Sequence, residues 1–111
     1  MLWCLGNESN RFDAFHDAQH YAIHVMEQDQ QELALRFARD GRDFSHTEWH
    51  ADDRGRPLLD TCLARFDCSL FARHPAGDHA ILVGLVENVM VRPGKGLIFK
   101  RGQFGGFDDL M

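Results

Sequence analysis

His79 is the strongest candidate for a catalytic side chain. It comes directly after Pro75-Ala76-Gly77-Asp78, whose composition predicts a tight turn between two strands. An imidazole just past such a turn stands at the rim of a sheet, where it can accept or donate a proton or a hydrogen bond near neutral pH. The alternative is that His79 only bonds its own turn, and the residues by themselves favour that alternative.

A polar loop near the start of the chain is the second candidate. Gly6-Asn7-Glu8-Ser9-Asn10 follows an apolar stretch and precedes a predicted short helix. Backbone amides at a helix start, together with Asn and Ser side chains, suit a phosphate group. Ordinary helix capping by Ser9 or Asn10 explains the same residues equally well. Glu8 disfavours a phosphate unless its carboxylate points away.

Gly84 interrupts a strongly apolar strand. Glycine weakens a strand, so it often marks a bulge or a close approach of the backbone to another group. The functional interpretation is room for a flat ring or a partner chain, and the structural one is a bend of a barrel. The sequence does not separate the two.

Seven histidines raise the question of a metal-binding protein. His16/His20 and His46/His50 are each spaced i, i+4, but zinc needs three or four converging ligands and the His-Glu-x-x-His order is missing. We therefore expect no metal site. Signatures of a Rossmann dinucleotide fold, a P-loop or a serine nucleophile elbow are also missing.

Composition predicts one globular domain over residues 1–111. The chain is 44% apolar and 11% aromatic, and its net charge is −5, which disfavours nucleic acid and gives no reason to expect membrane binding. Cys4, Cys62 and Cys68 form no C-x-x-C pair, so we expect reduced thiols and a cytoplasmic location. The N-terminus lacks the pattern of a signal peptide.

The apolar patterns predict a mainly β, α+β domain. Strands are expected at residues 1–5, 21–26, 63–74, 79–91 and 97–100, and helices at 10–18 and from a capping-box-like start at Asp29 to Arg39. Residues 42–61 are expected to be irregular. Because the later strands are joined by turns without helical crossovers, they predict an antiparallel, barrel-like sheet with two helices packed outside.

The chain resembles the NAD(P)H-dependent flavin reductases. The resemblance is carried by Leu2 to Ser9, by Phe66-Asp67-Cys68 with Ala72-Arg73-His74, by Ala76 to Val86, and by Arg101-Gly102-Gln103-Phe104-Gly105, which is similar to the family's closing Arg-Gly-x-Tyr/Phe-Gly. It implies an antiparallel Greek-key split β-barrel. Because the family's earlier Ser/Thr-rich strands have no counterpart here, it also implies an N-terminally truncated domain, the C-terminal portion of the family's domain.

The resemblance further implies a function and a set of site residues. It implies hydride transfer from NAD(P)H to FMN or FAD, a homodimer, and supply of reduced flavin to a partner monooxygenase. It places His79 as the catalytic residue beside the flavin and nicotinamide rings. The cofactor-binding residues would be Asn7, Ser9, Asn10, Gly84, Arg101 and Phe104.

Two points stay open under this resemblance. The alternative function is an inactive split-barrel remnant that dimerises or binds flavin weakly. His24 stands where the family usually carries Asn in a Phe-x-Val-Asn-like strand, so its role is undetermined.

Overall fold

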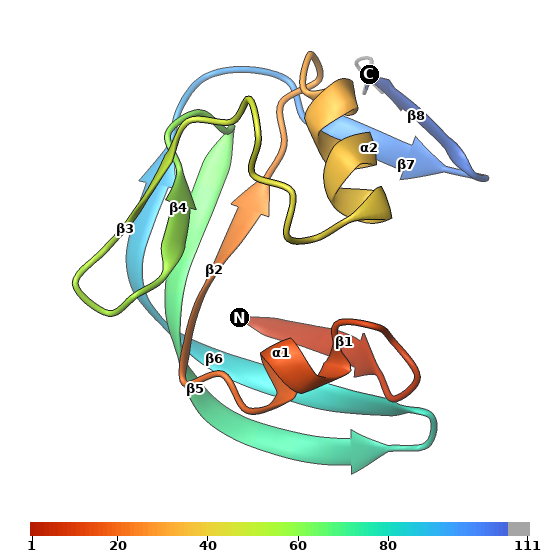
Figure 1. Cartoon of the computed structure of the whole chain (residues 1–111), viewed down its shortest axis with the longest axis vertical. Coiled ribbons are helices and arrows are strands. Elements are labelled where there is room, and N and C mark those ends of the chain that lie inside the picture. Colours follow the sequence, from red (N-terminus) through yellow and green to blue (C-terminus); the bar gives the residue numbers. More distant parts are fainter. Residues whose placement is uncertain (107–111) are drawn as a thin grey trace.

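The computed structural model describes residues 1–106, which form eight strands and two short helices (Figure 1). The elements in chain order are β1 (Leu2–Gly6), α1 (Phe12–His16), β2 (His20–Val25), α2 (Gln31–Arg39), β3 (Trp49–Ala51), β4 (Pro57–Leu59), β5 (Ala64–Ala76), β6 (His79–Val91), β7 (Leu97–Lys100) and β8 (Gln103–Gly106). No helix within residues 1–106 is long and apolar enough to cross a membrane.

The central sheet is antiparallel, with strand order β1-β6-β5-β2. Its backbone is the β5–β6 hairpin, which pairs from Ala64 opposite Val91 to Ala76 opposite His79. The connection is the two-residue turn Gly77-Asp78. Gly77 has a φ of 64°, a conformation that only glycine adopts readily and that two-residue hairpin turns of the primed types require. The predicted hairpin and its central apolar strand are confirmed.

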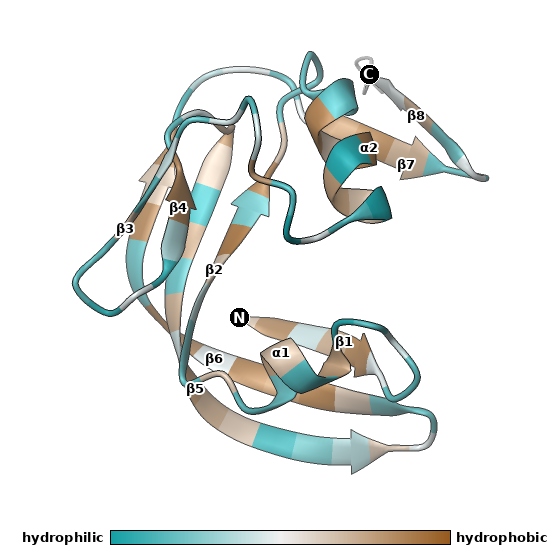
Figure 2. Cartoon of the chain, viewed as in Figure 1, coloured by the Kyte–Doolittle hydropathy of each residue, from teal (hydrophilic) through white to brown (hydrophobic). Residues whose placement is uncertain are grey.

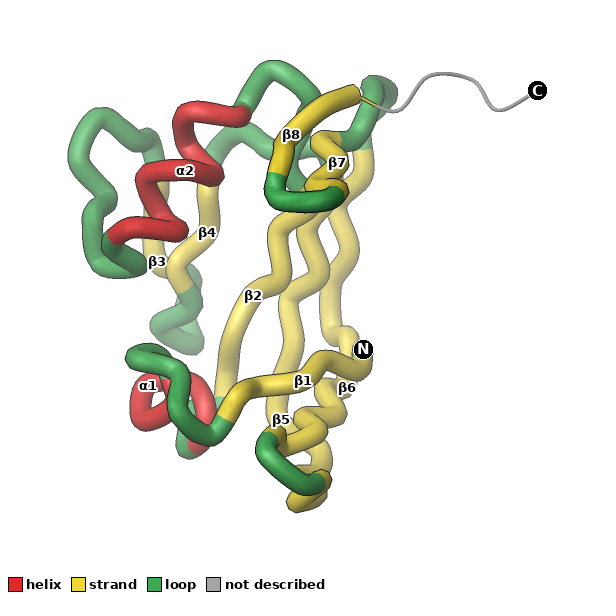
Figure 3. The backbone as a smooth tube through the Cα atoms, turned by 90° about the vertical axis from the view of Figure 1, so that its right-hand side faces the viewer, coloured by secondary structure: helices red, strands yellow, loops and turns green. Residues whose placement is uncertain are grey.

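Two β-bulges bend this sheet. The register of β5 against β6 shifts between Asp67 and Cys68 and again between Leu70 and Ala72, where Phe71 is the extra residue. Bulges increase the local twist and curl a sheet. Figure 1 shows the resulting curvature of β5 and β6, and Figure 3 shows both helices on the same side of the sheet. The fold is a curled antiparallel half-barrel.

A small hydrophobic core lies beneath α1. Leu5, Ala80 and Leu82 are buried there, and Trp3, Phe12 and Phe15 pack against them. Side chains alternate between the two faces of a strand, so Leu5 of β1 and its neighbours Ala80 and Leu82 of β6 face α1. The strand predicted at residues 1–5 and the helix predicted at 10–18 are thereby confirmed as β1 and α1, with boundaries that differ by a few residues.

Two other segments differ from expectation. The segment 42–61, expected to be irregular, contains the β3–β4 hairpin, and β8 pairs with β7 through Phe104 opposite Phe99. Three-residue strands such as β3 and β4 are too short to show a period in the sequence. The β3–β4 hairpin is held by Arg56, which is 3% exposed and bonds Asp52, Glu87 and the Cys68 carbonyl oxygen.

The start of α2 also corrects the sequence prediction. The helix begins at Gln31, its N-cap is Gln30, and no side-chain hydrogen bond caps it, so Asp29 does not form the expected capping box. Gln30 instead accepts a hydrogen bond from the Glu27 amide through Oε1, at 2.8 Å, and donates to the Thr61 carbonyl oxygen, also at 2.8 Å. The side chain of the N-cap residue Gln30 therefore joins two loops and does not cap the helix.

Candidate functional site

The tip of the β5–β6 hairpin holds His79 against the end of β1. Gly6 is the Cα partner of His79 in the sheet, and a Cβ built on Gly6 would meet only the His79 ring, with Nε2 at 3.7 Å. Asp78 Oδ1 lies 2.7 Å from His79 Nδ1. The imidazole is therefore half-exposed, bonded on its Nδ1 side by the turn and bordered on its Nε2 side by a residue without a side chain.

Asn7 joins the loop after β1 to this hairpin tip. Its backbone amide donates to the Asp78 carbonyl oxygen at 2.9 Å, and its side-chain amide donates to the Gly77 carbonyl oxygen at 3.3 Å. These two bonds bring Asn7 and His79, two of the predicted site residues, to one place. They also use the Asn7 amide group for structure, which leaves its Oδ1 as the free polar atom.

Ser9 and Asn10 lie farther along the same loop and have different surroundings. Ser9 Oγ accepts a hydrogen bond from the Arg11 amide at 3.1 Å, two residues on, so the turn-stabilising alternative describes its hydroxyl. Asn10 lines a cavity on the helix side of the sheet. The polar loop is thus real, but its members face different directions.

Gly84 packs closely against the core of its own chain. It lies on the helix side of the sheet, and a Cβ built there would strike the Tyr21 hydroxyl and lie 3.1 Å from Tyr21 Cζ and 3.2 Å from Cys68 Cβ. Tyr21 is 3% exposed, so this close approach is made by the core of the same chain. The close approach predicted at Gly84 is thus made by Tyr21, and a flavin contact at Gly84 stays a prediction.

Arg101 and Phe104 lie on the β7–β8 hairpin, at the opposite end of the chain's fold from the β5–β6 tip (Figure 1). Arg101 has a φ of 54° and occupies the turn beside Gly102, and its side chain is exposed. Phe104 packs on Phe99, with ring centroids 4.9 Å apart. Within one chain these two residues do not join His79.

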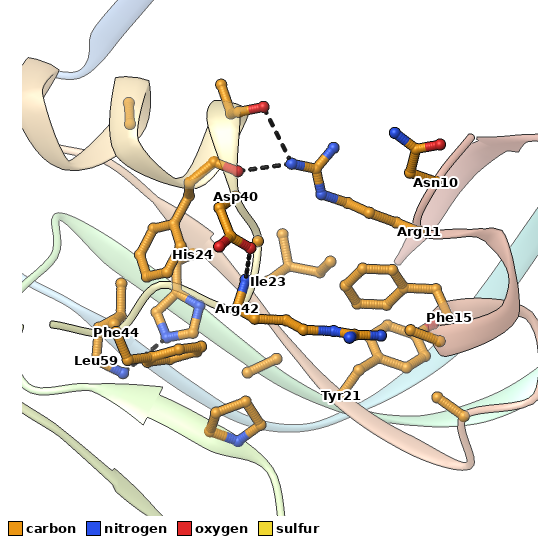
Figure 4. A pocket seen from close by; sticks show the side chains of 18 of the residues that line it. Asn10, Arg11, Phe15, Tyr21, Ile23, His24, Asp40, Arg42, Phe44 and Leu59 are labelled. Carbon is orange, nitrogen blue, oxygen red and sulfur yellow. Dashed lines mark hydrogen bonds between the residues drawn. The ribbon is translucent and has the colours of Figure 1, made fainter.

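An open cavity of about 930 Å³ lies between β2, α1 and α2. Figure 4 shows its aromatic wall with Phe15, Tyr21 and Phe44, and Arg42 extending along it. Trp3 contributes to the same wall, with its ring centroid 5.4 Å from that of Phe15. The cavity and His79 are on opposite faces of the sheet, because Trp3 and Leu5 alternate with Gly6, the partner of His79.

This cavity contains polar groups that the sequence analysis did not single out. Trp3 Nε1, His20 Nδ1 and the Tyr21 hydroxyl are buried and have no hydrogen-bond partner within the described part of the chain. Burial raises the pKa of the Tyr21 hydroxyl, which therefore keeps its proton. The available signal was one aromatic residue in each of two short strands, Trp3 and Tyr21, but core packing explains these residues equally well.

His24 has a structural role. Its Nε2 accepts a hydrogen bond from the Leu59 amide at 3.0 Å, which joins β2 to β4. Burial, reinforced by the positive charge of Arg65, lowers the pKa of His24 from 6.5 to about 4. The imidazole is thus neutral at pH 7 and can accept this bond. This bond gives a role to His24, which the sequence left undetermined.

The histidine pairs noted in the sequence do not form a metal cluster in residues 1–106: no group of three or more His, Cys, Asp or Glu side chains converges there. His16 and His50 are instead each paired with one carboxylate, Asp17 and Asp60. The cysteines among the described residues are unpaired, with Cys62 and Cys68 buried and Cys4 exposed.

Comparison with known proteins relates the chain to flavin reductases. Residues 1–108 match the family described as "Flavin reductase like domain". The chain is 45% identical over 107 residues to FMN reductase (NADH) SmoA of Agrobacterium fabrum, a match that covers 96% of this chain and 62% of SmoA. It is 35% identical to the reductase component of the flavin-dependent trigonelline monooxygenase of Acinetobacter baylyi, over 94% of this chain and 34% of that protein.

Solved structures give the same relationship. Nitrilotriacetate monooxygenase component B from Mycobacterium thermoresistibile superposes with a TM-score of 0.86 at 28% identity, covering 96% of this chain and 62% of that one. The Streptomyces globisporus NADH:FAD oxidoreductase SgcE6, solved with NAD and FAD fragments, also gives 0.86, at 27% identity, over 96% of this chain and 67% of that one.

These matches establish the split-barrel fold that the resemblance implied. The chain spans about three fifths of the length of SmoA, the 45% identical relative, and a smaller share of the trigonelline reductase. The family profile covers nearly the whole chain, and the SmoA match covers 96% of it. The chain therefore belongs to the flavin reductase family.

Proposed function

We propose that this chain is an NAD(P)H-dependent flavin reductase that supplies reduced FMN or FAD to a partner monooxygenase. The 45% identity to an NADH-dependent FMN reductase carries the proposal, and the relationship to reductase components of two-component monooxygenases supports the partner. SmoA is named for FMN and SgcE6 for FAD, so either flavin is compatible with the family.

The open edge of His79 at the hairpin tip supports contact with a flat heteroaromatic ring. Gly6 leaves the Nε2 and Cδ2 edge of His79 without a covering side chain, and Asn7 Oδ1 lies on the neighbouring loop with no bond committed to it within residues 1–106. A bound flavin would supply the hydride acceptor. The contribution of this chain would be to hold the nicotinamide and flavin rings in contact, which needs orientation and polar contacts but no protein nucleophile.

We also propose that the chain acts as a homodimer through the outer surface of β6. Val89 and Val91, whose partners Phe66 and Ala64 share one face of β5, are 56% and 67% exposed, and Phe71 on β5 is 75% exposed. Figure 2 shows the hydrophobic stretches along β6. Exposed apolar surface on strands favours association with another sheet, and a second copy could bring Arg101 and Phe104 near His79 of the first.

The activity is tested with the purified chain by flavin binding and NADH oxidation. Fluorescence quenching of FMN and FAD gives the affinities, and the fall in NADH absorbance with added flavin gives turnover. Flavin-dependent NADH oxidation supports the reductase. Flavin binding without turnover would favour the alternative, a weak flavin-binding remnant, and neither binding nor turnover would refute the proposed function of this chain.

Replacement of His79 by alanine should reduce turnover about tenfold and change flavin affinity less. The loss of one hydrogen bond to the reacting partners at a preorganised site costs about 2.7–4 kcal/mol, and a half-exposed rim should lose less, about 1.4 kcal/mol. Stopped-flow reduction of saturating flavin measures the step. His74→Ala, on the end of β5, is the control and should change little. Unchanged rates in both variants would make His79 a turn residue only.

Replacement of Val89 by lysine should convert the proposed dimer into a monomer. A lysine in the centre of an apolar contact would bury an unpaired charge, which interfaces tolerate poorly. Size-exclusion chromatography with light scattering at micromolar concentration gives the mass. Leu35→Lys, on α2 and 39% exposed, is the matched control and should leave the mass unchanged. A compact monomer for the unmodified chain would exclude this interface.

A further inference from the structure

Helix α2 is held to the rest of the chain by few contacts. Within residues 1–106 none of its nine residues is buried, although Ala34, Phe37 and Ala38 share the face that lines the aromatic cavity. A helix of this length is marginal in water by itself, so its position depends on its attachments. Figure 1 shows α2 and α1 on either side of the region that the cavity occupies.

Most of these attachments join α2 to the loops beside it in the chain. Gln30 ties the N-terminal end of the helix to two loops, as described above. Arg36 donates to the Ser45 carbonyl oxygen at 2.6 Å, and the Phe37 ring packs on Phe44 with centroids 5.0 Å apart. Ser45 and Phe44 belong to the loop that follows the helix. These contacts therefore allow α2 and this loop to move together.

Arg11, the residue just before α1, joins the C-terminal end of α2 to the other side of the cavity. Its guanidinium donates to the Phe37 carbonyl oxygen at 2.6 Å and to the Ala38 carbonyl oxygen at 3.2 Å (Figure 4). The last carbonyl groups of a helix lack partners within the helix and carry the negative end of its dipole, so they favour a cation. Gly41 makes room for Arg11, because a Cβ built there would lie 2.9 Å from Arg11 Nε.

We infer that α2 is a lid over the aromatic cavity and that Arg11 is the latch that holds it. When the two bonds from Arg11 break, α2 can rotate about Gln30 and the loop after Arg39 without uncovering a buried side chain of its own. The rotation gives solvent access to Trp3 and Phe15 on the opposite wall. Segments with few buried apolar contacts open at a lower free energy than core strands do. This motion is separate from the proposed reductase activity and needs no bound flavin or NADH.

Amide hydrogen exchange of the chain alone tests the opening. In the unmodified protein the α2 amides should exchange faster than those at the centre of β5 and β6, through an opening that urea promotes only weakly because it exposes little surface. Arg11→Met keeps the length of the side chain but removes its donors. It should speed exchange of the α2 amides roughly tenfold, the effect of one charge-assisted hydrogen bond, and leave β5 and β6 unchanged. Exchange of α2 together with β5 and β6, or unchanged α2 rates in Arg11→Met, would overturn the inference.

Two further variants separate the loss of a latch from a general loosening. Arg73 of β5 likewise donates to a carbonyl oxygen at the end of a helix, that of His16 in α1, so Arg73→Met is the matched control and should leave α2 exchange unchanged. Gly41→Ala keeps every charge, but its methyl group would push the Arg11 side chain aside. It should speed α2 exchange by a smaller factor than Arg11→Met does. Faster α2 exchange in Arg73→Met would overturn the assignment of Arg11 as the latch.

Quenching of Trp3 fluorescence by acrylamide measures whether the movement opens the cavity. Trp49, the other tryptophan, is replaced by phenylalanine in every protein compared, which keeps an aromatic ring beside Phe44. The quenching constant should rise in Arg11→Met and stay constant in Arg73→Met. Faster α2 exchange without greater quenching would mean that the helix unwinds in place, which would overturn the lid. Neither measurement uses flavin or NADH, so a failed reductase assay would leave this result unaffected.

Discussion

Replacement of Gly84 by alanine should lower the free energy of unfolding by about 2–3 kcal/mol, the upper part of the range for overpacking a core. The new methyl group would strike the Tyr21 hydroxyl and lie 3.1 Å from Tyr21 Cζ. Tyr21 cannot move aside easily, because its ring is buried and packs edge-on against Trp3 at 5.8 Å. Urea unfolding followed by tryptophan fluorescence measures the change.

Two further variants identify the cause of this loss. Gly105→Ala in β8 is the matched control, because a Cβ there meets nothing within 4 Å. Tyr21→Phe removes the hydroxyl, which has no hydrogen-bond partner in residues 1–106. Combined with Gly84→Ala in a double variant, it should recover about half of the stability that Gly84→Ala loses. Equal stability of Gly84→Ala and Gly105→Ala would mean that Tyr21 yields its place without cost.

Gly84 also shows why part of the candidate site could not be derived from the sequence. A glycine in an apolar strand indicates a close approach, and the structure confirms one. The identity of the approaching group depends on the order of the strands in the sheet. Tyr21 of β2 lies over Gly84 of β6 because β2 pairs with β5, which lies between them. That pairing joins residues separated by more than forty positions, which local patterns do not specify.

His79 is the opposite case. Its position at the rim follows from a turn and a strand that are adjacent in the chain, so the sequence was sufficient to predict it. Asp78 was treated only as a turn residue, although it is the immediate neighbour of His79. The missing information was the direction of the Asp78 side chain. This direction depends on the backbone of the turn and on the hydrogen bond from the Asn7 amide to the Asp78 carbonyl oxygen.

The fold was predictable where an element is long or bounded by strong turn residues. The β5–β6 hairpin combines two long strands with a turn at Gly77, so the strand pattern and the turn residue predict the same structure. The β3–β4 hairpin lacks such support. Its position is fixed by Arg56, whose guanidinium bonds carboxylates at Asp52 and Glu87. A partly buried ion pair between residues 31 positions apart leaves no periodic trace in the sequence.

The two faces of the sheet have different roles in this arrangement. The helix-side face carries the core, the aromatic cavity and Tyr21, and the other face carries Gly6 and His79 at the hairpin tip. Within one chain, the proposed site residues lie at two separate places. His79 is at the tip of the β5–β6 hairpin, and Arg101 and Phe104 are on the β7–β8 hairpin. A second copy is the simplest means of joining them, which is why the mass measurement on the Val89 variant bears on the site as well as on assembly.

The stability of the protein should fall by about 2–3 kcal/mol between pH 6.5 and pH 4 because of His24 alone. Its pKa is about 4 in the folded chain against 6.5 ordinarily, so the unfolded chain binds a proton in this window and the folded chain does not. His24 thus contributes stability that is fully present above pH 6.5 and is lost as the pH falls toward 4. Partial exposure of the ring to water places the effect below the full value of the pKa difference.

His24→Gln isolates this contribution. A glutamine oxygen can accept the Leu59 amide as Nε2 does, at 3.0 Å, but it does not titrate, so the variant should lose less stability on acidification. Urea midpoints of the unmodified protein and the variant at pH 7, 5.5 and 4.5 give the difference in their loss of stability. The effect of carboxylates such as the nearby Asp67 is common to both proteins and cancels to first order. His74→Gln, at an exposed position on β5, should follow the unmodified protein. Parallel pH profiles for all three proteins would show that the folded chain does not lower the pKa of His24.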